Sequence, residues 1–154
     1  MGLWDKIKQA KNFVTGGGAD VSITFESMEV PVGGSMKIKV TALVKDAPLK
    51  MDKAYVKIRA RETVQAKDRD HNNGRSTTET VRNSVDTWKH EMPISGGQQL
   101  EANQSYEWEA EIQIPNGNNP TYRGRNAWHE YEVFAGLDVP GNDPDSGWQQ
   151  ITVK

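Results

Sequence analysis

Residues 106–114 alternate without interruption between apolar and polar side chains, and this period of two constrains the fold more than any other feature of the chain. The apolar members are Tyr106, Trp108, Ala110, Ile112 and Ile114. Such alternation is typical of a strand with one buried face and one solvated face. It recurs at residues 21–25, 36–44, 56–60 and 131–135, and residues 148–153 have the character of a closing strand.

Clusters rich in glycine, proline, asparagine and aspartate separate these runs, at residues 31–34, 46–48, 68–76, 95–99, 115–120 and 140–147. About seven strands joined by such turns, with almost no helical pattern between them, predict an all-β fold. We expect an antiparallel two-sheet β-sandwich of the immunoglobulin-like kind, because each strand has a single apolar face to bury. The 154 residues suit one such domain, which we place at residues 19–154.

Residues 1–18 form a separate segment, because their apolar residues recur every three or four positions rather than every two. This spacing predicts a short N-terminal amphipathic helix, followed by a flexible glycine joint at residues 16–18. The apolar face of this helix contains Leu3, Trp4, Ile7, Phe13 and Val14. It suits an anionic membrane surface, the end of the sandwich or a second subunit in a homo-oligomer, and the pattern does not separate these contacts.

Two rows of like charge lie on different predicted strands, and we name both as candidate protein-binding surfaces. The basic row is Lys57, Arg59 and Arg61, and the acidic row is Glu107, Glu109 and Glu111. If the two strands are neighbours, the rows pair across them at roughly 0.2–1 kcal/mol per pair. Otherwise one row stays unpaired and receives an oppositely charged segment of a protein partner.

The segment 68–79 has oxygen ligands at the spacing of a calcium-binding loop, supplied by Asp68, Asp70, Asn72 and Glu79. However, Asn73 stands where such loops have glycine, and the flanking residues predict strands rather than helices. A polar hairpin tip explains the same composition, because asparagine and glycine both tolerate tight turns. Calcium binding is therefore the minor alternative for this segment.

A ligand-binding sandwich is the second function that the sequence permits. Indole rings stack on sugars. Trp108 is in phase with core residues and predicted to be buried, whereas the pattern does not decide whether Trp88, Trp128 and Trp148 are exposed. Three further aspartates at residues 138, 143 and 145 have the ligand chemistry of calcium without the spacing. Carbohydrate or calcium binding is thus the alternative to protein binding.

The sequence contains no recognisable catalytic motif. His90 and His129 each precede a glutamate, but Ile94 and Val133 stand where a zinc-protease motif needs its second histidine. The chain has no cysteine, no nucleophile elbow and no phosphate-binding loop. We therefore predict a protein that is not an enzyme and has no catalytic residues and no cofactor.

Charge and hydropathy limit the partners and the location. The formal net charge is −2, whereas a nucleic-acid binder normally has a strong basic excess, so no nucleic-acid partner is expected. No apolar run approaches the roughly 18–20 residues of a membrane span, and no secretory signal opens the chain. We expect a cytoplasmic protein, peripheral to a membrane if the N-terminal helix binds one.

Two segments resemble arrestin-like domains. MEVPVGGSMKIKVTALVKDAPLKMDKAYVKIRARETV has their Pro/Gly turn, long strand, short connection and basic strand. SYEWEAEIQIP, followed by NPTYRGRNAWHEYEVFAGLDVPGNDPDSG, is similar to their second half. Among such domains, the chain is most similar to the bacterial sporulation-control proteins, which open with a short helix and have a segment like Gly136-Leu137-Asp138 and Asp143-Pro144-Asp145.

The resemblance implies a two-sheet sandwich without catalytic activity that acts as an adaptor or scaffold through protein contacts, sometimes at membranes or cytoskeletal assemblies. Arrestins carry two such sandwiches, so sites built between two domains are not transferred to this chain. The protein partner is unknown, and strand addition at a sheet edge or docking on a charged face are the expected modes of contact.

Overall fold

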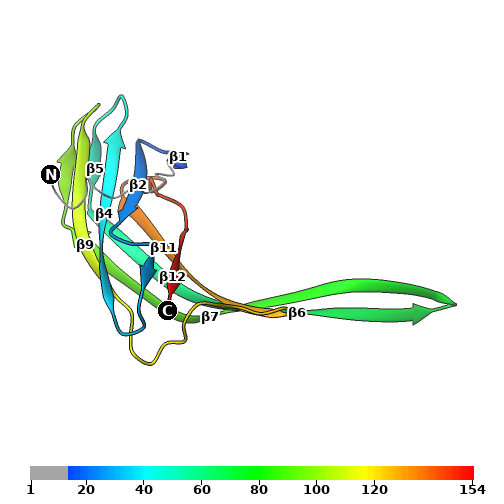
Figure 1. Ribbon diagram of the computed structural model, residues 1–154. Coiled ribbons are helices and arrows are strands. Elements are labelled where there is room, and N and C mark those ends of the chain that lie inside the picture. The colour runs from blue at the N-terminus through cyan, green and yellow to red at the C-terminus, as the bar shows by residue number, and fades with distance from the viewer. Residues whose placement is uncertain (1–13) are drawn as a thin grey trace.

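The structure is a computed structural model and describes residues 14–154. Two sheets lie face to face, and one long hairpin projects from them (Figure 1). The first sheet has four antiparallel strands. In spatial order they are β1 (Val14–Gly16), β2 (Ala19–Phe25), β4 (Ser35–Val44) and β9 (Ser105–Gln113).

The second sheet has six strands, and its order is β3-β12-β11-β6-β7, with β10 paired to β11. Their bounds are β3 (Glu29–Val30), β12 (Gln149–Val153), β11 (Ala127–Asp138), β6 (Lys53–Asn72), β7 (Arg75–Ser95) and β10 (Tyr122–Arg123). Its pairs are antiparallel except β12 with β3. A separate pair is formed by β5 (Leu49–Met51) and β8 (Gln98–Leu100).

The core lies between the two sheets and is built from the apolar side of each alternating strand. Ile23 and Val40 of the first sheet and Ile58 and Val133 of the second are all buried. The residues between them on each strand point to the other face, as the period of two requires. The predicted all-β fold of antiparallel sheets is confirmed, and the apolar alternation is its physical cause.

The N-terminal helix is the first point at which the prediction and the structure differ. Val14, assigned to the apolar face of that helix, begins β1, because its backbone pairs with Val21 of β2. Gly17, with φ +71°, and Gly18 form the turn between these strands. The other residues of the predicted helix face, Leu3, Trp4, Ile7 and Phe13, lie outside the described residues.

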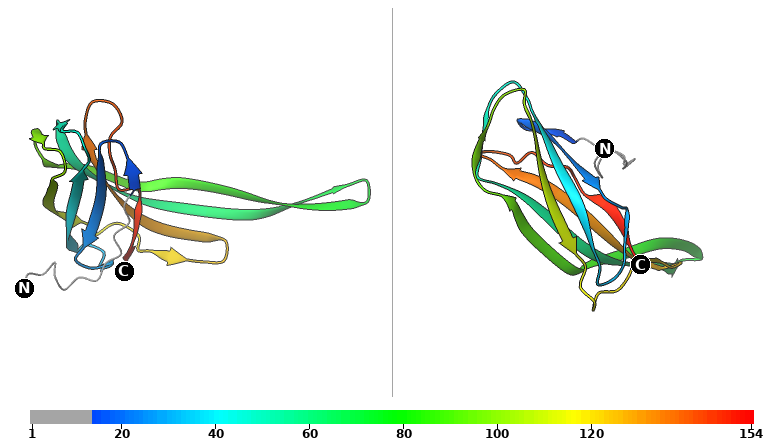
Figure 2. Two further views of the ribbon diagram at one scale, coloured as in Figure 1. Left: turned by 90° about the horizontal axis from the view of Figure 1, so that it is seen from above. Right: turned by 60° about the vertical axis from the view of Figure 1, so that its left-hand side comes forward.

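The hairpin of β6 and β7 is much longer than the sequence predicts. Residues 68–76 were expected to form a turn cluster, but only Asn73 (φ +51°) and Gly74 (φ +76°) lie in the turn. Positive φ at both positions matches the two-residue turn that Asn-Gly favours. The strands therefore stay in register out to Asn72 and Arg75, and the ribbon extends away from the sandwich (Figure 2).

Candidate interaction surfaces

The basic row faces away from the core, on the outer face of the second sheet. Arg59 pairs with Glu132 of β11 at 3.3 Å, and its guanidinium carbon lies 3.8 Å from the ring centroid of Trp148. Lys57 lies over the Tyr55 ring at 5.4 Å. Each of these cations therefore has a partner within its own sheet.

Arg61, the third member of the basic row, bonds to β7 instead. Its Nε donates to Oδ1 of Asp86 at 2.7 Å, and this hydrogen bond holds the pKa of the Asp86 carboxyl below its usual range. Burial opposes this effect, and the Arg61 charge adds to it. The bond ties β6 to β7 at the point where the hairpin leaves the sandwich.

The acidic row lies in the other sheet, on β9, with all three carboxylate residues exposed. The backbone register places Glu109 opposite Lys39 and Glu111 opposite Lys37 of β4, and Lys39 also lies 3.7 Å from Glu107. Ser35 donates a hydrogen bond to Glu111 at 2.6 Å. Because β9 is at an edge of its sheet, this row of three carboxylates adjoins two lysines on β4. On the other side, no strand of the described part of the chain is hydrogen-bonded to β9.

The alternative in which the two rows pair with each other is wrong. The basic row lies on β6, whose neighbours are β11 and β7, whereas the acidic row lies on β9, whose neighbour is β4. Strand order decides these partners, and strand order depends on contacts between segments far apart in the chain. Whether either row binds a protein stays a prediction.

The distal hairpin, residues 66–81, lies where the sequence predicts a polar hairpin tip, but its length as a two-stranded ribbon was not predicted. Every residue in it is exposed. Among residues 14–154 no third strand flanks it, because β11 begins at Ala127, which pairs with Val64. Its two faces differ in charge, since alternate residues of a strand point to opposite sides.

One side of the distal hairpin, its basic face, contains only cations and neutral polar groups. These are Lys67, Arg69 and His71 on β6, and Ser76, Thr78 and Thr80 on β7. The other side, its acidic face, contains Asp68, Asp70 and Glu79, with Arg75 near the tip. The run Lys67-Asp68-Arg69-Asp70 alternates in sign of charge, and this period of two was the available signal for an extended ribbon with charged faces.

The calcium candidates lie on this acidic face rather than around a loop. Asp68, Asp70 and Asn72 follow one another along β6, and Glu79 of β7 stands opposite Asp68. Residues two apart on a strand are about 6–7 Å apart, so these oxygens spread along the ribbon instead of surrounding one point. No group of three or more histidine, aspartate or glutamate side chains in residues 14–154 is placed to hold a metal ion.

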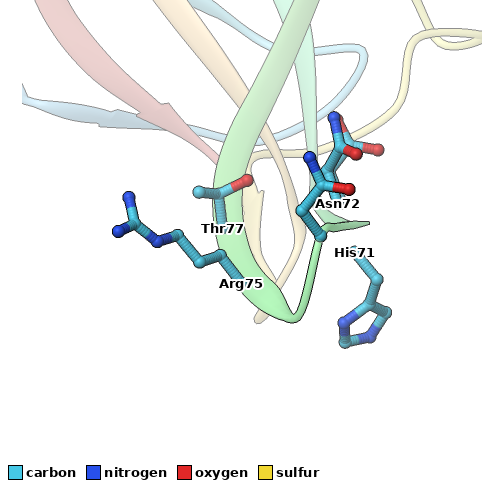
Figure 3. A pocket seen from close by; sticks show the side chains of 6 residues that line it. His71, Asn72, Arg75 and Thr77 are labelled. Atoms are coloured by element: carbon cyan, nitrogen blue, oxygen red, sulfur yellow. The ribbon is translucent and has the colours of Figure 1, made fainter.

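A depression at the hairpin tip is lined by residues of both strands. Figure 3 shows His71 and Arg75 extending to different sides of the ribbon, as their places on the basic face and on the acidic face require. Asn72 and Thr77, which also line it, are neutral. The tip therefore offers no convergent set of charged groups for a small ligand.

The second acidic loop uses two of its carboxylates to fix the chain. Asp143 accepts hydrogen bonds from the Tyr55 hydroxyl at 3.0 Å and from the Val139 N–H at 3.2 Å. Asp145 accepts from the Gly147 N–H at 2.8 Å. Burial, followed by the hydrogen bond to Asp143, raises the pKa of the Tyr55 hydroxyl. These carboxylates have a structural role that is independent of any ion.

Trp88, Trp108, Trp128 and Trp148 are partly buried. Trp108 is less buried than predicted, because β9 is an edge strand. The ring of Trp128 has the guanidinium groups of Arg82 and Arg123 each at 5.2 Å. With Arg59 against Trp148, two of the candidate sugar-stacking rings already contact cations of this chain. Trp88 packs beside the core and stacks with His90 at 6.1 Å.

The buried histidine has a complete set of structural partners. His129 is 1% exposed, with Thr87 Oγ1 2.7 Å from Nε2 and the Pro120 carbonyl 3.0 Å from Nδ1. These contacts join β11 to β7 and to the preceding loop.

Within residues 14–154, no helix is long and apolar enough to cross a bilayer.

Comparison with known proteins identifies the fold. The two sheets and the connections between them define an arrestin-like β-sandwich, the class that the sequence resembles. A solved structure with this fold is Spo0M, the sporulation control protein from Bacillus subtilis. It superimposes with a TM-score of 0.63 and 16% sequence identity over 90% of this chain, which spans 50% of that chain.

The predicted resemblance to sporulation-control proteins is thus confirmed at the level of the fold. No protein-family model matches the sequence. No curated protein matches it either.

Proposed function

We propose that the chain is a non-catalytic protein-interaction adaptor of arrestin-like type, and that the distal hairpin is its contact surface. The main observation in support is that every residue from 66 to 81 is exposed, in a ribbon that lies outside the core. Such a ribbon adds no apolar burial to the sandwich, so the fold alone gives no reason for its length. A binding role gives one.

The backbone of the ribbon favours a protein as the partner. Both of its strand edges carry N–H and C=O groups that no neighbouring strand within residues 14–154 satisfies. Extended segments of other chains add to such edges by main-chain hydrogen bonds. Two-stranded ribbons are marginally stable alone in water. A partner strand would therefore stabilise the hairpin as it binds.

The chemistry of the surface and the fold likeness support the same proposal. Histidines 90 and 129 are occupied in ring stacking and in buried hydrogen bonds, which fits a non-catalytic role. Spo0M is named a sporulation control protein, and a regulatory role of that kind suits a module that works through contacts. We place the chain in the cytoplasm, with its N-terminal segment as a second candidate contact, for a membrane or for another subunit.

Photocrosslinking in cells of the source organism tests the proposal. A photoreactive residue replaces Thr78 on the hairpin. A matched variant carries it at Gly117, an exposed loop position where an added Cβ has no atom within 4 Å. We expect discrete protein adducts from position 78 that are absent from position 117. Adducts from neither position, or equal adducts from both, would contradict the proposal.

A further inference from the structure

We propose that a second copy of this chain supplies a partner for the hairpin: the outer edge of its strand β6 adds to the outer edge of β9, and the basic face then lies beside the acidic row. This inference rests on the proposed function, because it uses the same hairpin surface. It concerns two strand segments in which charged side chains of one sign occupy every second position and so lie on one face. The distal hairpin supplies cations, and β9 supplies carboxylates.

The cations of the hairpin have no acidic partner on their own face. The register places Thr80 opposite Lys67 and Thr78 opposite Arg69, and the carboxylates of the ribbon lie on its other side. Within the described part of the chain, no ion pair involves Lys67 or Arg69. Two cations on a solvated ribbon are therefore available to a partner.

The acidic row on β9 has the matching spacing. Its members occupy alternate positions of an edge strand and outnumber the lysines opposite them on β4. An antiparallel strand added there with residue 69 opposite Glu109 would place Lys67 beside Glu111 and His71 beside Glu107. Opposite charges directly across a strand pair stabilise it, and this pairing sets the register.

The contact must form between molecules. The hairpin extends away from β9 of the same chain in Figure 1 and in the left-hand view of Figure 2. One chain therefore cannot close this contact on itself. Two chains can exchange hairpins in a closed pair, or each can pass its hairpin to the next, and both arrangements raise the molecular mass.

Charge exchange tests the pairing. The hairpin variant carries Lys67→Glu and Arg69→Glu, and the edge variant carries Glu109→Lys and Glu111→Lys. All four positions are exposed, so the sandwich should remain folded, which thermal unfolding checks. In either variant alone, the hairpin and the β9 edge carry charges of the same sign. Each should therefore associate about tenfold more weakly than the wild type. An equimolar mixture should recover association, because each hairpin then meets an edge of opposite charge.

The control removes the hairpin and keeps the charge. Deleting residues 67–72 and 75–80 joins the paired residues Ala66 and Val81 to the retained Asn73-Gly74 turn. The deletion removes three cations and three carboxylates, so the formal net charge remains −2. This shortened chain should be monomeric.

Sedimentation at low ionic strength over a range of concentrations measures the molecular mass of the wild type, the two charge variants, their mixture and the shortened chain. The expected result is that the wild type and the mixture associate at concentrations about tenfold lower than either variant alone requires. A monomeric wild type, a monomeric mixture or an associating shortened chain would each overturn the inference. Adducts between position 78 and other proteins would still support the proposed function, so the two failures are distinguishable.

Discussion

The Nε atom of Arg61 donates to Oδ1 of Asp86 at 2.7 Å, and this bond closes the base of the hairpin. It lies beside a register shift in the β6–β7 pairing, where Ala60 is opposite Trp88 and Arg61 is opposite Asp86. The extra residue, Thr87, makes a β-bulge, and bulges bend and twist a strand. The ribbon therefore turns away from the sandwich at a point that an ion pair fixes.

Asp86→Asn should destabilise the protein at neutral pH and have little effect in strong acid. The folded protein lowers the pKa of this carboxyl, so its contribution is present above the unfolded pKa, roughly 3.9, and is lost as the pH falls through the folded pKa. Urea unfolding at pH 7 should show a loss of about 1 kcal/mol relative to the wild type. A difference that persists unchanged well below pH 3 would contradict this account.

Gly136→Ala should destabilise the second sheet, because a Cβ at Gly136 would lie 2.5 Å from the Tyr55 Oη and 2.6 Å from its Cζ. The hydrogen bond to Asp143 holds the tyrosine ring in place, so the ring cannot yield freely. We expect a loss of about 1–3 kcal/mol in chemical denaturation. Gly117→Ala, where an added Cβ meets nothing within 4 Å, is the matched control and should change stability little.

Alkaline pH should destabilise the wild type more than Tyr55→Phe. The folded protein raises the pKa of Tyr55, so the stability that its neutral form provides is complete below the unfolded pKa, about 10, and is lost as the pH rises toward the folded value. Unfolding free energies at pH 8 and pH 11 measure this loss. Equal losses in both proteins would show that Tyr55 does not cause it.

The sequence specifies the sandwich well, because burial of one face leaves a readable pattern. Met36, Ile38 and Val40 alternate with polar neighbours, and all three are buried as expected, whereas Lys37 between them is exposed. The distal hairpin leaves no such pattern, since both of its faces are solvated and neither strand contributes to the core. Its signs are the turn residues Asn73-Gly74 and the alternation of charge at residues 67–70, and neither fixes the length of the ribbon.

The partners of the charged rows could not be predicted for a different reason. Arg59 pairs with Glu132, which is 73 residues away in the chain, and the period of two fixes the face of each residue but not the neighbouring strand. The same limit applies to Val14, whose pairing with Val21 overrides a helical spacing. Local pattern thus predicts which side of a strand a residue occupies, and tertiary contacts decide what it meets there.

The shortened hairpin should leave the stability of the sandwich nearly unchanged. The deleted residues are all exposed, and the paired residues that flank the retained turn keep their register. We expect the free energy of unfolding to change by less than about 1 kcal/mol, since no apolar side chain of the core is removed. A loss of several kcal/mol would show that the hairpin belongs to the fold rather than to a contact.

Hydrogen exchange of the full chain, at concentrations where it is monomeric and where it is associated, tests the central claim that the hairpin is a contact surface. In the monomer, amides of residues 66–81 should exchange faster than those of β4 and β11, because the ribbon has no core beneath it. Association should slow the exchange of residues 67–71 and 107–111 together. Hairpin amides as protected as the core in the monomer, or protection on association that bypasses residues 67–71, would contradict the account.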